Sequence, residues 1–271
     1  MAELHLGCHW PPLYDKRNIK LSAIMPLRQL FVPREFDAEV DLLGRQFPAR
    51  MWGNNREGCC VIAAQANWTR VLEHIEQGRL VNITDDDVHN EYRRQSNGAD
   101  NGLYMLDAFN SWRNDGWHIA GGTLNKAKVP GCWRKIFPKP EPEKQHLNIH
   151  AFAALDSLDE LRAAVYYLHG CNIAVRMYDE DFRQFEAGET WHVNGNPGEF
   201  RGGHCVYIPA FNTDGTIDCW TWGKRQKIDP EWLWNRQYDM YGVVDNRNAF
   251  IANSPVDVEK LEALLREIVN S

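Results

Sequence analysis

The chain has 271 residues, and its 44% hydrophobic content is enough for a substantial globular core. Its formal net charge of -7 gives no positive field to attract phosphate groups, so we expect no nucleic-acid partner. No apolar run reaches membrane-spanning length and the first residues lack the features of a secretory signal, so we expect a cytoplasmic protein without a membrane partner.

The first part of the chain, residues 1–50, has no clean hydrophobic period and is punctuated by proline. We expect it to be irregular and to wrap a surface. A helical lobe is predicted to follow, over residues 51–130. Its first helix runs from Cys59 to Gln77, where apolar residues recur on one face. A polar turn that contains glycine precedes this helix, so Cys60 falls in its first turn.

Two more helices are expected in this lobe. Thr84, followed by three aspartates, predicts a capped helix that ends at about Gln95. Another is expected from about Gly102 to Asn114. After them, the proline-, lysine- and glutamate-rich run 138–144 is typical of a solvated connector.

A β-rich lobe is predicted over residues 145–250. Ser157 and Glu160 form a capping-box pattern for one helix. Short apolar or alternating runs separated by glycine, asparagine and aspartate then indicate strands. These runs are 172–177, 203–211, 216–222 and 241–244. A C-terminal helix is predicted over 254–270. In this prediction the helices come first along the chain and an antiparallel sheet or barrel follows, which is typical of an α+β fold.

The number and spacing of the cysteines argue against a disulfide framework or a structural zinc site. There are seven, and apart from the adjacent pair Cys59 and Cys60 they show no CxxC spacing. The other five are Cys8, Cys132, Cys171, Cys205 and Cys219. We expect no metal site and no cofactor.

Cys60 and His204 are the candidate catalytic pair. A cysteine in the first turn of a helix has its thiolate stabilised by the helix dipole and by unpaired backbone N–H groups, although many such cysteines are simply small buried residues. His204 enters an apolar strand directly after two glycines, where another backbone or a substrate can approach closely.

Several motifs, in one order along the chain, resemble the papain-like cysteine peptidase superfamily. Residues 54–63, NNREGCCVIA, resemble the family's nucleophile signature, with Cys60 as the nucleophile. Residues 203–211, GHCVYIPAF, resemble its histidine strand, and residues 220–223, WTWG, resemble its Asn-Ser-Trp-Gly element. His204 also follows Cys60 at the roughly 130 to 150 residue separation typical of papain-type enzymes. Taken together, these motifs are similar to those of uncharacterised bacterial and phage-encoded members of the family.

The resemblance implies a papain-like α+β fold with a cleft between the lobes, and acyl transfer through a Cys-His dyad and a thioester acyl-enzyme. The oxyanion would lie between the Cys60 backbone N–H and the Asn54 side chain. The third triad position falls on Trp220, whose indole cannot accept a hydrogen bond from an imidazole. Asp218, two residues earlier in the same strand, is the alternative. Trp222 would shield the pair from water.

Three functions remain open on the sequence. The first is a cysteine peptidase acting on peptide or protein substrates. The second is an amidase or acyltransferase with the same dyad, and the third is a catalytically silent papain-like module that binds or has a structural role. Substrate preference and oligomeric state cannot be derived from these motifs, because loops decide specificity.

Overall fold

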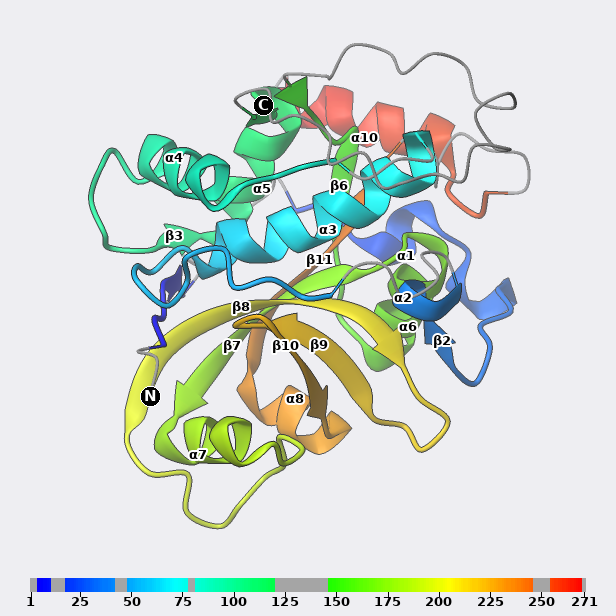
Figure 1. Cartoon of the computed structure of the whole chain (residues 1–271). Helices are drawn as coiled ribbons and strands as arrows, with labels where there is room; N and C mark the ends of the chain where they lie inside the picture. The colour runs from blue at the N-terminus through cyan, green and yellow to red at the C-terminus, as the bar shows by residue number, and fades with distance from the viewer. Residues whose placement is uncertain are drawn as a thin grey trace, which may run out of the picture.

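A helical part lies over an antiparallel sheet in the computed structural model (Figure 1). The structure describes residues 4–10, 18–41, 48–77, 81–119, 146–245 and 254–269. Cys132 and the connector at 138–144 lie outside these residues.

The helical part contains the three predicted helices, α3 (Cys60–Gln77), α4 (Asp85–Gln95) and α5 (Met105–Asn114). The predicted cap of α4 is present: Thr84 Oγ1 accepts a hydrogen bond from the Asp87 backbone N–H (3.1 Å), and the Asp87 carboxylate accepts from the Thr84 N–H (2.8 Å). Helix α5 begins three residues later than expected, because Leu103–Tyr104 forms a short strand, β3.

The sheet has seven strands in the order β10-β9-β8-β7-β11-β6, with β2 added beside β8, and every pairing is antiparallel. Within the described residues this order is linear and the sheet is not closed into a barrel. The strands are β2 (Phe36–Asp37), β6 (Ala151–Ala154), β7 (Cys171–Tyr178), β8 (Phe200–Phe211), β9 (Ile217–Thr221), β10 (Lys224–Ile228) and β11 (Gln237–Val244). Strands β7, β8, β9 and part of β11 coincide with runs predicted from the sequence, whereas β6 and β10 were not predicted.

Strand β8 separates the two hydrophobic cores. Alternate residues of a strand face opposite sides, and Cys205 and Tyr207 lie in the core shared with α3. Val206 and Ile208 lie in the second core, on the other side of the sheet. The sheet is therefore buried on both faces, and α3 rests on the face toward the helical part (Figure 1).

The remaining elements cover the sheet and the ends of the chain. They are β1 (Cys8–His9), α1 (Leu21–Ile24), η1 (Leu27–Gln29), α2 (Ala38–Asp41), β4 (Trp117–His118), β5 (His146–Leu147), α6 (Leu158–Tyr167), α7 (Asp179–Ala187), α8 (Pro230–Arg236) and α10 (Val258–Val269). Ser157 caps α6 by accepting from the Glu160 N–H (3.1 Å), as predicted. None of the helices in the described residues is long and apolar enough to cross a membrane.

Candidate functional site

Cys60 is the first residue of α3, and the loop before it is tied to its surroundings. The Gly58 N–H donates to the Asp100 carboxylate (2.9 Å), which also accepts from the Tyr92 hydroxyl (2.7 Å). The buried Glu57 carboxylate accepts two hydrogen bonds from the Arg93 guanidinium (3.0 and 3.2 Å). Since Tyr92 and Arg93 both belong to α4, this helix fixes the turn that presents Cys60.

His204 lies in β8 and is almost completely buried. Its Nε2 atom is 2.6 Å from Thr221 Oγ1, and its ring stacks on the Trp222 indole with 4.0 Å between ring centroids. When Nε2 carries the hydrogen, the threonine oxygen accepts it and Nδ1 keeps its lone pair. Nδ1 itself has no hydrogen-bond partner among the described residues. Burial lowers the pKa of His204 to about 3, so the ring is neutral in this structure.

Neither residue proposed from the sequence orients His204. The Asp218 carboxylate instead accepts from Arg225 Nη2 (2.7 Å) and Asn212 Nδ2 (3.2 Å). The Trp220 indole packs edge-on against Tyr207. Thr221, directly after Trp220, faces the other side of β9 and reaches the imidazole. The sequence offers one signal for this role, a hydroxyl directly before Trp222.

The Asn54 side chain is buried and already engaged. Its Nδ2 atom donates to the backbone oxygens of Glu57 (3.1 Å) and His5 (3.3 Å). An amide that holds one carbonyl oxygen in this position is also suited to hold an oxyanion. In this structure the amide is used by two backbone carbonyls of the chain itself.

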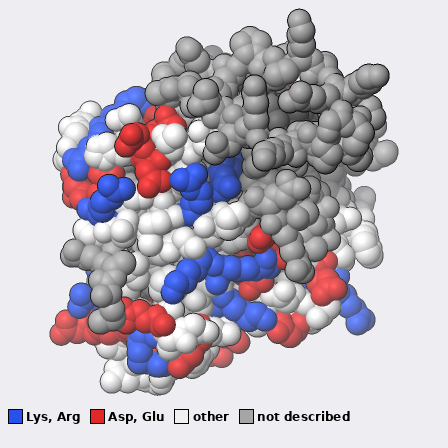
Figure 2. Space-filling model, viewed as in Figure 1, with Lys and Arg blue, Asp and Glu red and all other residues white. Residues whose placement is uncertain are grey.

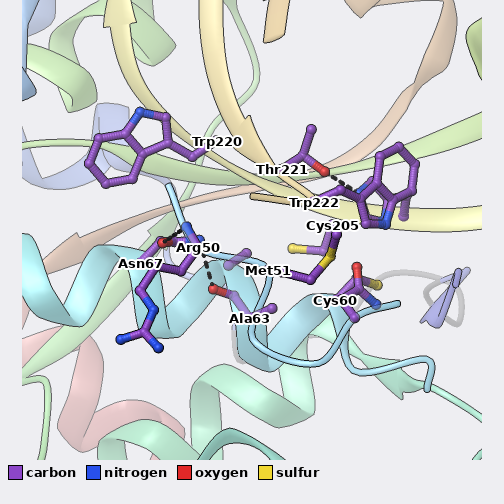
Figure 3. Close-up of a pocket in the computed structure, with 12 residues that line it drawn as sticks. Arg50, Met51, Cys60, Ala63, Asn67, Cys205, Trp220, Thr221 and Trp222 are labelled. Atoms are coloured by element: carbon purple, nitrogen blue, oxygen red, sulfur yellow. Dashed lines mark hydrogen bonds between the residues drawn. The ribbon is translucent and has the colours of Figure 1, made fainter. Parts of the chain in front are cut away.

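A cavity of about 10 Å³ brings the predicted site residues together. This volume is close to the smallest that holds one water molecule. The lining side chains come from the turn before α3, from α3, and from β8 and β9 (Figure 3). They include Cys60, His204, Asn54, Trp220, Thr221 and Trp222. Within the described residues, no group of histidine, cysteine, aspartate or glutamate side chains is arranged to hold a metal ion.

Residues 4–10, called the N-terminal segment below, run between the two lobes beside this cavity. Cys8 is buried, Trp10 is exposed and the other residues of the segment are partly buried. The Gly7 N–H donates to the Gly203 carbonyl (3.1 Å), and the Leu103 N–H donates to the Gly7 carbonyl (2.8 Å). The His5 carbonyl accepts from Trp222 Nε1 (3.3 Å) as well as from Asn54. Backbone hydrogen bonds have no sequence signature, so residue patterns could not reveal this docking.

The N-terminal segment also buries the Cys60 thiol. Burial raises the pKa of Cys60 well above its usual range, and the neighbouring Cys8 thiol raises it further. Backbone N–H groups of Cys205 and Gly7 act in the opposite direction but do not outweigh these effects. Within the described residues, no hydrogen bond joins Cys60 to His204. Burial therefore favours a neutral thiol and a neutral imidazole in this structure.

Comparison with solved structures shows a papain-like fold. The chain is similar to xylellain, a cysteine protease from Xylella fastidiosa, with a TM-score of 0.63 and 13% identity over 90% of this chain and 98% of that one. It is similar to procathepsin B S9 from Trypanosoma congolense, with a TM-score of 0.59 and 13% identity over 88% of this chain and 86% of that one. A cysteine protease from Carica candamarcensis matches with a TM-score of 0.51 and 16% identity, over 79% and 99% of the two chains.

The likeness is one of fold and not of sequence. No family model matches the chain, and no curated protein matches it by sequence.

Proposed function

We propose that this papain-like chain is a cysteine hydrolase that cleaves peptide or amide bonds through Cys60 and His204. The observation that supports the proposal is the small cavity lined by Cys60 at the start of α3, by His204, whose ring contacts Thr221, and by Asn54. These are the nucleophile, the general base and the oxyanion donor that acyl transfer requires.

The reaction begins when the N-terminal segment leaves the site. His204 Nδ1 then takes the proton from the Cys60 thiol, and the thiolate attacks the substrate carbonyl carbon. The Cys60 backbone N–H and the Asn54 amide hold the oxyanion. The imidazolium returns its proton to the leaving amine as the carbon–nitrogen bond breaks, which gives a thioester. Water, deprotonated by the same imidazole, then hydrolyses the thioester and releases the acid.

Thr221 supplies the orientation that the dyad needs. A hydroxyl oxygen accepts the Nε2 hydrogen and fixes the tautomer with a free Nδ1, although it carries no charge to stabilise the imidazolium. A cysteine nucleophile depends less on that charge than a serine does, because the thiol is intrinsically more acidic and more nucleophilic. Trp222, stacked on the imidazole, keeps water from its face.

The substrates we propose are peptides or proteins and not nucleic acids. On the described part of the face seen in Figure 2, basic and acidic side chains are interspersed and form no field of one sign. A channel for a phosphate backbone would need such a field. An amidase or acyltransferase with the same dyad would share this surface.

The test compares the wild type with Cys60→Ala, His204→Ala and the control Cys171→Ala on a library of peptides and simple amides. Cys171 is a buried thiol in the second core, so its variant measures the effect of losing a thiol elsewhere. We expect turnover by the wild type and the control only. The substrates turned over separate a peptidase from an amidase. Equal rates in the wild type and Cys60→Ala would reject the hydrolase and favour the silent binding module.

A further inference from the structure

Cys8 lies where the N-terminal segment crosses the turn before Cys60 and the strand that contains His204. The preceding residue, Gly7, is packed so closely that an added Cβ atom would be 1.8 Å from the Gly58 carbonyl oxygen. An added Cβ at Gly203 would be 2.0 Å from the Cys8 carbonyl oxygen. Gly58 stands two residues before Cys60. The backbone around Cys8 is therefore wedged between the nucleophile loop and the histidine strand.

A third buried thiol belongs to the same place. Cys205 faces the same side of β8 as Gly203, which Cys8 contacts. Its Sγ atom is 3.5 Å from Met105 Sδ. Cys8, Cys60 and Cys205 lie in one hydrophobic core, and each is at most 5% exposed. The Tyr238 hydroxyl donates to the Cys8 carbonyl (3.0 Å) and holds the segment against this cluster.

We propose that Cys8 is an oxidative modification site, which forms a disulfide with Cys60 in the presence of hydrogen peroxide and so locks the N-terminal segment over the catalytic pair. Formation of the disulfide does not depend on hydrolysis of a substrate. Its meaning as a lock on activity rests on the proposed function.

The chemistry takes two steps. When the segment is displaced, the Cys60 thiolate attacks one oxygen of hydrogen peroxide; the O–O bond breaks, a sulfenic acid forms, and the second oxygen leaves as water after taking up a proton. When the segment docks again, the Cys8 sulfur attacks the sulfenic sulfur and displaces its hydroxyl as water. Two thiols and one peroxide thus become one disulfide and two waters.

Cys8 suits the role of resolving cysteine, whose thiol attacks the sulfenic acid of Cys60, better than Cys205 does. Cys205 is fixed in the centre of a paired strand, whereas Cys8 is carried on the segment that must move for Cys60 to become reactive. The cysteine that returns to the site is then also the one that meets the sulfenic acid. A sulfenic acid that is captured in this way is protected from further oxidation.

The experiment uses the full chain, reduced and then treated with hydrogen peroxide. Free thiols are blocked, and the protein is digested without reductant and analysed by mass spectrometry. In the wild type and in Cys171→Ser, a matched control in the second core, we expect a linked peptide pair containing Cys8 and Cys60 that dithiothreitol separates. In Cys8→Ser we expect loss of the link and oxidation of Cys60 to sulfinic acid.

Two results would overturn the proposal: a wild-type disulfide that joins Cys60 to Cys205, or oxidised Cys60 with Cys8 still free. The linked peptide is read by mass and needs no substrate. A reduced protein that forms the link but hydrolyses nothing would therefore reject the hydrolase and leave the modification site intact.

Discussion

Replacing Gly7 by alanine is expected to open the site without changing any residue of it. The Gly7 backbone has an ordinary φ, so alanine is conformationally acceptable there. Its Cβ atom, however, would be 1.8 Å from the Gly58 carbonyl oxygen and 2.5 Å from the carbonyl carbon. Real contacts are not this short, and the obstacle is backbone, so the N-terminal segment must move away.

The size of the effect follows from the cost of overpacking. Extra carbon atoms in a well-packed interior cost about 1–3 kcal/mol. Each 1.4 kcal/mol changes an equilibrium tenfold, so the ratio of displaced to docked segment should rise about 5- to 140-fold. The hydrogen bonds that Gly7 makes with Gly203 and Leu103 would weaken as well, which acts in the same direction.

The assay is the rate at which limiting iodoacetamide alkylates Cys60 at neutral pH, followed by mass spectrometry, together with the rate of peptide hydrolysis. Gly195→Ala is the matched control, because a Cβ atom added at Gly195 meets nothing within 4 Å. Both rates should rise in Gly7→Ala and stay unchanged in the control. Equal alkylation of Cys60 in the two variants would refute the idea that the segment controls access.

Three further predictions concern the site and its titration. Thr221→Val should lower kcat by up to about 10²-fold, the lower end of what a general base contributes, while Thr221→Ser keeps the hydroxyl and most of the rate; equal kcat in both would dismiss the orienting role. Asn54→Ala should lower kcat about 10²–10³-fold if its amide stabilises the oxyanion, and an unchanged kcat would remove it from the mechanism. Burial lowers the pKa of His204 to about 3 and that of His169 to about 4, so the unfolded chain binds these two protons first as the pH falls below about 6.5. Burial raises the pKa of Asp239 to about 7, which acts in the opposite sense and offsets one histidine. The free energy of unfolding should therefore fall by about 1.4 kcal/mol per pH unit between about pH 6.5 and 4, and urea unfolding curves that coincide at these two pH values would contradict the assignment.

Local signals in the sequence were enough for the elements that carry the catalytic pair. The apolar face after Cys60 and the capping residues at Thr84 and Ser157 act within one or two turns of helix, so residue order alone reveals them. Strands β7, β8 and β9 were found for the same reason. The position of Cys60 at the start of α3 and that of His204 inside a strand follow from these elements.

Other elements could not be found in this way. Strand β10 (Lys224–Ile228) reads as a charged run, and it becomes a strand because its backbone pairs with β9. Helix α7 (Asp179–Ala187) has three acidic residues in its first turn and few apolar ones, so its period is weak. In both cases long-range contacts decide the structure, and local preference does not.

The arrangement of the site was decided by tertiary structure alone. Whether Trp220, Asp218 or Thr221 reaches His204 depends on which residues of β9 lie on the same face of the sheet as His204, and a shift of one residue reverses that face. The N-terminal segment is held mainly by backbone hydrogen bonds and by glycines in close contact, which leave no periodic pattern in the sequence. The residue types thus specified a thiol and an imidazole, and the packing of strands and termini determined which groups surround them, because those contacts join residues far apart in the chain.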